Sequence, residues 1–105
     1  MVRGDVHLVR MPSGRGRVQQ GRRYAVVVQA DKLAPLSTAL ICPTSQSAAP
    51  ASFRPQVELP DGRTRVLCEM VTAVDIRGLG ERVGHLSFDD LAAVDAALSL
   101  VLDLP

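Results

Sequence analysis

Aromatic residues are scarce in this chain, which has no tryptophan, one tyrosine and two phenylalanines among its 105 residues. So few rings cannot form the stacked platform on which an RRM-type domain holds the bases of RNA. Binding of a nucleic acid would therefore have to come from charged and hydrogen-bonding side chains.

Cysteine and histidine are almost as rare. Cys42 and Cys68 have no metal-ligand spacing, and His7 and His85 belong to no His-x-x-x-His pattern. We therefore expect no metal site and no cofactor, and we interpret both cysteines as buried thiols. We interpret the two histidines as structural, although two histidines could also carry out acid–base cleavage of RNA.

Long apolar runs are absent as well. No stretch approaches the ~18 residues that cross a bilayer, and the first nine residues, MVRGDVHLV, lack the apolar core of a signal peptide. At 47% hydrophobic residues the chain can bury one core. We expect a single domain over residues 1–105, located in the cytoplasm and without a membrane partner.

The chain is rich in arginine near its N-terminus. Five arginines fall in one glycine-punctuated segment and its flanks: Arg10, Arg15, Arg17, Arg22 and Arg23. Residues 1–57 carry eight Lys+Arg against two Asp+Glu, and residues 58–105 carry four against nine, so the two parts have net charges of +6 and −5. Guanidinium groups stay charged and match phosphate oxygens, which favours a polyanionic ligand. The alternative is a solvated surface loop.

Short strands follow one another along most of the chain. Apolar and β-branched segments bounded by glycine and proline predict strands at residues 5–9, 24–29, 38–42, 54–59, 63–74 and 81–86. Pro43 is expected to end the third of these, Pro60-Asp61-Gly62 predicts a hairpin turn, and the long segment 63–74 should bend near Glu69.

One helix is predicted at the C-terminus. Ser87 is an N-cap candidate, and Asp89 and Asp90 suit the positive end of a helix dipole. Apolar residues then recur at three- and four-residue steps up to Leu102, so the helix should span residues 88–102. These elements predict a mainly β fold, either a small SH3-like barrel or a strongly curved antiparallel sheet, with a C-terminal helix.

Three motifs occur in the order seen in a known family. RGDVHLV opens the chain, G-x-V-Q-Q-G-R-R precedes an apolar strand, and ALICPTSQ follows. Together with the stretch from residue 65 to residue 104, this order resembles the MazF/PemK family of toxin ribonucleases over nearly the whole chain. Tyr24 stands where the family usually has proline, and Val18 and Met70 also depart from its pattern.

The resemblance implies an SH3-like barrel that works as a homodimer. It implies metal-independent cleavage of single-stranded RNA, with 2′,3′-cyclic phosphate and 5′-hydroxyl products, and inhibition by an antitoxin with an acidic, partly disordered tail. The catalytic residues implied are Arg23 and Thr44. The residues expected to bind RNA are Arg10, Arg15, Arg17, Gln19, Arg22, Ser45 and Gln46.

Other interpretations stay open. Arg23 could instead form an ion pair, for example with Glu69, and the Thr44 hydroxyl could simply bond the backbone at a strand end. The whole chain could be a non-enzymatic gyrase poison like CcdB, or an RNA-binding barrel without catalysis.

Overall fold

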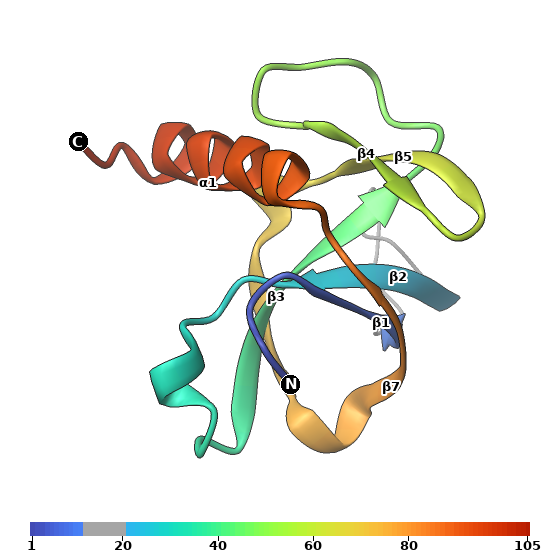
Figure 1. Ribbon diagram of the computed structural model, residues 1–105, viewed down its shortest axis with the longest axis vertical. Helices are drawn as coiled ribbons and strands as arrows, with labels where there is room; N and C mark the ends of the chain where they lie inside the picture. The colour runs from blue at the N-terminus through green and yellow to red at the C-terminus, as the bar shows by residue number, and fades with distance from the viewer. Residues whose placement is uncertain (12–20) are drawn as a thin grey trace.

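The computed structural model describes residues 1–11 and 21–105, which form a curled antiparallel half-barrel with one helix at the C-terminus (Figure 1). The strands and the helix are β1 (Asp5–Met11), β2 (Gly21–Val27), β3 (Thr38–Ser45), β4 (Gln56–Leu59), β5 (Gly62–Val66), β6 (Thr72–Asp75), β7 (Leu79–His85) and α1 (Phe88–Leu102). Short 3₁₀ turns are η1 (Asp31–Leu33), η2 (Cys68–Met70) and η3 (Ile76–Gly78). The predicted mainly β fold with a closing helix is confirmed.

Strand β3 is the centre of the sheet. The strand order is β4-β5-β3-β2-β1-β7, and β6 pairs with β3 off this path. One half of β3, Thr38 to Ile41, pairs with β6, whereas Thr44 and Ser45 pair with β5. The strand therefore changes partner in its middle, which lets the sheet curl.

The prediction that Pro43 ends the third strand is wrong. Pro43 pairs with Ala25 inside the strand, which runs on to Ser45. Proline lacks an N–H and is tolerated in a sheet only where no ladder bond is required. Pro43 meets this condition because β3 changes partner there, and its carbonyl oxygen accepts a bond of 2.9 Å from the Leu67 N–H.

Two predictions for the part of the chain after β4 are confirmed: the bend near Glu69 and the hairpin turn. The predicted strand at residues 63–74 breaks into β5, η2 and β6, so the chain bends at Glu69 as expected. Leu59 and Gly62 are paired across the hairpin, which leaves Pro60 and Asp61 as its turn. Gly62 has φ of 114°, a conformation that residues with a side chain rarely adopt.

Helix α1 has the predicted bounds and cap. The Ser87 hydroxyl accepts a bond of 3.1 Å from the Asp90 N–H, an interaction typically worth about 1 kcal/mol. Val94, Ala97 and Leu98 are buried and join a core cluster with β-strand residues such as Val26 and Val66, so the helix covers one part of the sheet. No helix in the described part of the chain has the length and apolar character needed to cross a membrane.

Candidate functional site

A hollow of about 340 Å³ opens where the ends of neighbouring strands come together. It is lined by residues from β1, β2, β3 and β5, from the loop after β3 and from the hairpin turn: Leu8, Arg23, Tyr24, Thr44, Ser45, Gln46, Ser47, Asp61 and Thr64. The lining is therefore mostly polar and combines residues from separate segments of the sequence.

Arg23 and Thr44 line this same hollow although they are far apart in the chain. Arg23 lies near the start of β2, in register with Val9 of β1, and its side chain is exposed. Thr44 lies near the end of β3, the strand that pairs with β2. Antiparallel pairing brings the start of one strand beside the end of the next, and this is why both residues line the hollow.

Thr44 is buried, with 3% of its surface exposed, and its hydroxyl group donates a bond of 2.8 Å to the carbonyl oxygen of Tyr24. The Thr44 hydroxyl therefore bonds to the backbone, as the alternative interpretation of this residue expects. A hydroxyl has one proton and two lone pairs. With the proton committed to Tyr24, the Thr44 oxygen faces a ligand as an acceptor, which suits a hydroxyl better than a phosphoryl oxygen.

Ser45 and Gln46 also line the hollow, as does Ser47. The Ser45 and Ser47 hydroxyl oxygens are 3.3 Å apart, and the Gln46 side-chain amide donates a bond of 3.4 Å to the carbonyl oxygen of Asp61. Two of the residues expected to bind RNA are thus beside Arg23 and Thr44.

Of the other expected RNA-binding residues, only Arg10 has a side chain that the structure describes. Arg10 is exposed and lines a second hollow of about 270 Å³, between β1 and the segment around Gly78 and Gly80. Leu8 lines both hollows. Arg22 is paired with Arg10 in the register of β1 and β2. Arg15, Arg17 and Gln19 lie outside the described residues.

Sequence reasoning missed several lining residues: Leu8, Tyr24, Ser47, Asp61 and Thr64. In the sequence, Tyr24 stands out only as a departure from a family pattern, and Asp61 only as a turn residue. Neither has a local signal for a binding role. Their place in the hollow follows from the β2–β3–β5 order of the sheet.

The loop between β3 and β4 is anchored near its C-terminal end by Arg54. Arg54 forms an ion pair with Glu69, with distances of 2.6 and 2.7 Å from its Nη2 and Nε to one carboxylate oxygen. Its Nη1 donates to the Ala49 carbonyl oxygen at 3.2 Å, and its own carbonyl oxygen accepts from Arg65 at 2.9 Å. Glu69, which the sequence offered as a partner for Arg23, is thus ion-paired with Arg54.

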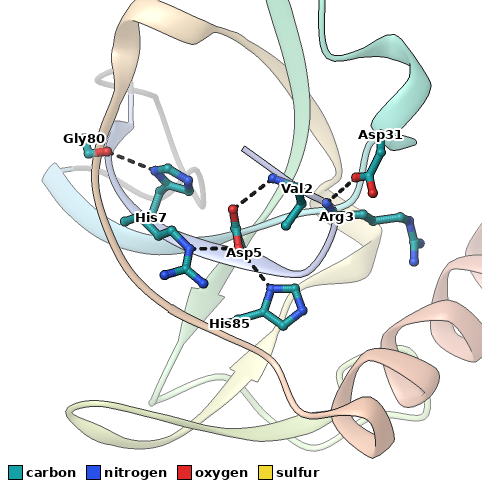
Figure 2. A network of polar contacts seen from close by, with 8 residues as sticks. Val2, Arg3, Asp5, His7, Asp31, Gly80 and His85 are labelled. Atoms are coloured by element: carbon teal, nitrogen blue, oxygen red, sulfur yellow. Dashed lines mark hydrogen bonds and ion pairs between the residues drawn. The ribbon is translucent and has the colours of Figure 1, made fainter.

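Neither histidine lines the hollow; His85 bonds to Asp5, and His7 bonds to Gly80 close by (Figure 2). The Asp5 carboxylate is buried and accepts bonds of 2.9 Å from His85 Nδ1, Arg82 Nε and the Val2 N–H. His7 Nδ1 lies 2.9 Å from the Gly80 carbonyl oxygen. This geometry supports the structural interpretation of both histidines.

Burial alone would raise the pKa of Asp5, but its donors outweigh this effect. The bonds from the Val2 N–H, His85 and Arg82 lower the pKa to about 2. Gly4 packs beside this network with φ of 93°, and a Cβ there would come within 2.9 Å of the His85 ring. Asp5 and Gly4 of the RGD motif therefore join the N-terminus to β7.

Cys42 and Cys68 are both fully buried thiols, as predicted. Their mutual hydrogen bond, together with burial, raises the pKa of the Cys42 thiol. Among residues 1–11 and 21–105, no three His, Cys, Asp or Glu side chains are grouped so that they could hold a metal ion.

Comparisons with known proteins agree with this architecture. A model of the family described as "PemK-like, MazF-like toxin of type II toxin-antitoxin system" matches residues 2–102. The candidate toxin Rv3098A of Mycobacterium tuberculosis is 38% identical over 106 residues, which cover 99% of each chain.

Two solved structures show the same fold. The Mycobacterium tuberculosis toxin MazF-mt6 superposes with a TM-score of 0.81 at 15% identity, over 96% of this chain and 98% of its own. A mycobacterial endoribonuclease in complex with its cognate antitoxin also gives 0.81, at 16% identity, over 100% and 97%. The chain therefore belongs to the PemK-like and MazF-like toxin family of type II toxin–antitoxin systems.

Proposed function

We propose that this protein is an endoribonuclease that cleaves single-stranded RNA through attack by the RNA's own 2′-hydroxyl, without a divalent metal. The observation that supports this most directly is that Arg23 and Thr44 line one polar hollow. Membership of a toxin family, and the mycobacterial relative of this fold named as an endoribonuclease, add to it.

Arg23 and Thr44 have different roles in the proposed reaction. The 2′-oxygen attacks phosphorus, the bond from phosphorus to the 5′-oxygen breaks, and the products are a 2′,3′-cyclic phosphate and a 5′-hydroxyl. The proton leaves the 2′-hydroxyl and the 5′-oxygen gains one, so the reaction has no net change in protons. The Arg23 guanidinium stabilises the negative charge that builds up on the phosphoryl oxygens.

Thr44 orients the nucleophile. Because its proton is donated to Tyr24, its oxygen accepts from the 2′-hydroxyl and aligns that group for attack. Ser45, Ser47 and Gln46 supply further hydrogen-bonding groups around the same space. Neither Arg23 nor Thr44 needs to act as a strong base, since the enzyme's contribution is position and charge.

The proposal extends to the partners of this protein. We propose a homodimer in the cytoplasm, whose arginine-rich segments give a shared positive groove for RNA. We also propose that a cognate antitoxin inhibits it with an acidic, partly disordered segment that competes for the same arginines. A structural relative was solved as an endoribonuclease with its cognate antitoxin, which supports such a partner.

The test is cleavage of a long unstructured RNA in excess EDTA, followed by analysis of the product ends. We expect undiminished cleavage, 5′-hydroxyl ends, and resistance of RNA with a 2′-deoxy sugar at the cut site. Activity that requires added Mg²⁺, or 5′-phosphate ends, would contradict the mechanism. RNA binding without any cleavage would favour a non-catalytic barrel, and binding of gyrase without binding of RNA would favour a CcdB-like poison.

A further inference from the structure

The hollow that contains Arg23 also contains an acidic residue. Among the described residues that line it, Arg23 is the one cation and Asp61 the one anion. A carboxylate repels phosphate, so Asp61 is unsuited to bind the phosphate that we propose for Arg23, and it must face another part of the RNA. We propose that Asp61 reads a base of the RNA by accepting hydrogen bonds from it, and that the preferred base is guanine.

The backbone at Asp61 is held in place from two sides. Asp61 belongs to the two-residue turn between β4 and β5, closed by the pairing of Leu59 with Gly62. Its carbonyl oxygen accepts from Gln46, which joins the turn to the loop after β3 at 3.4 Å. The short turn and this bond therefore fix where the side chain of Asp61 leaves the backbone at the rim of the hollow.

The Asp61 carboxylate is available to a ligand. It has no hydrogen-bond or ion-pair partner among residues 1–10 and 23–105, and the residue is exposed. An ionised carboxylate only accepts hydrogen bonds, and its two oxygens can accept two parallel ones. The ligand group that fits it must therefore present donors.

The four bases differ in this respect. The Watson–Crick edge of guanine presents two adjacent donors, N1–H and the N2 amino group, which match the two carboxylate oxygens. Adenine and cytosine present an amino group next to a ring acceptor, which would face the second oxygen unfavourably. Uracil presents one N–H between two carbonyl oxygens. Single-stranded RNA exposes these edges, and proteins read them in this way.

This inference rests on the proposed function, because it assigns the base that is bound beside the cleaved phosphate. Its test compares the wild-type protein with D61A and D61N. Cut sites in a mixed transcript pool are sequenced. In parallel, fluorescence anisotropy measures binding of 2′-fluoro oligouridines, which lack the nucleophile and carry guanosine, inosine, adenosine, cytidine or uridine at one central position.

We expect the wild type to prefer guanosine over uridine by a factor on the order of 10 to 100, and to lose part of this preference for inosine, which lacks the N2 amino group. D61A should lower the preference to within about threefold. D61N should shift it toward adenosine or cytidine, because an amide offers one donor beside one acceptor. E58Q is the matched control, since Glu58 lies on the same hairpin, is paired with Arg63 and does not line the hollow.

Identical base profiles for the wild type, D61A and D61N would overturn the inference while leaving the proposed function intact. So would an equal gain in affinity of D61A for every oligonucleotide, since that result means simple relief of repulsion. A wild type that neither binds nor cleaves any RNA would overturn the proposed function, and the inference with it.

Discussion

The Thr44 hydroxyl donates its proton to the carbonyl oxygen of Tyr24 across the β2–β3 pair, at a distance of 2.8 Å. This bond fixes the orientation of the hydroxyl oxygen and leaves its lone pairs for a ligand. The same residue is therefore part of the sheet and part of the candidate active site, and the two roles can be separated by substitution.

Replacement of Thr44 by valine keeps the shape of the side chain and removes the hydroxyl. The Tyr24 carbonyl then loses its donor, so the free energy of unfolding should fall by about 1–3 kcal/mol. Cleavage should fall much further, by a factor on the order of 10², because the nucleophile loses its acceptor. Chemical denaturation and an RNA cleavage assay measure the two effects. T44S keeps the hydroxyl and should retain most activity; equal activity in T44V and the wild type would rule out a catalytic role.

Replacement of Arg23 by alanine should abolish most RNA cleavage without unfolding the protein. Loss of a group that stabilises developing charge costs on the order of 10²–10³ in rate. R23K should recover only part of the activity, because an ammonium group cannot form the paired bonds of a guanidinium. The matched control is R63A, since Arg63 is also exposed but pairs with Glu58 outside the hollow. Cleavage by R23A within about tenfold of the wild type would remove Arg23 from the mechanism.

The Asp5 network should contribute stability that depends on pH. The pKa of Asp5 is lowered to about 2 in the folded chain, whereas an unfolded aspartate has a value near ~3.9. The contribution of its charge is therefore complete above about pH 4 and is lost as the pH falls toward 2.

D5N provides the comparison for this effect. Near pH 7 it should lower the free energy of unfolding by about 1–3 kcal/mol, because Asp5 accepts from His85, Arg82 and the Val2 N–H. The difference between D5N and the wild type should shrink below pH 4. Denaturation curves from pH 7 to pH 2 give this difference directly, and a constant difference over that range would contradict the assignment.

The Arg54–Glu69 ion pair should stabilise the loop that carries Gln46 and Ser47. Both side chains are about three-quarters buried, with 26% and 27% exposed, so the pair should couple by about 1 kcal/mol, more than a typical surface pair. R54A and E69A should each weaken RNA cleavage modestly, and the double variant should be little worse than either. A double-mutant cycle in both stability and cleavage measures the coupling; additive losses would mean that the pair does not act as a unit.

Reversal of the charges on Arg15 and Arg17 should weaken RNA and an acidic antitoxin peptide together. Both ligands are polyanions, and the RNA also releases condensed counterions, so affinities should fall steeply with salt. The R15E/R17E variant should have a smaller salt slope for RNA, by about one unit for each phosphate that the variant no longer neutralises. Reversal of Lys32 and Arg63 in the same assay controls for net charge. Unchanged binding of either ligand would argue against a shared site.

The sequence by itself determined those features that depend on a few adjacent residues. The bounds of α1 follow from Ser87 and the apolar spacing, because a capping hydroxyl and a 3.6-residue period are local properties. The break at Glu69 and the turn at Asp61 follow likewise from chain length and turn residues. The catalytic roles predicted for Arg23 and Thr44 likewise rest on the order of motifs along the chain.

Only the tertiary structure decided which residues meet. Pro43 stays inside a strand because β3 changes partner beside it, and no local rule predicts a change of partner. Asp61 and Thr64 reach the hollow because β5 follows β3 in the sheet, although a long loop and a further strand separate them from Thr44 in the printed chain. Pairing between distant strands depends on how the whole sheet buries its apolar side chains. No short segment of the sequence determines that burial, so the set of residues that line the site could not be predicted locally.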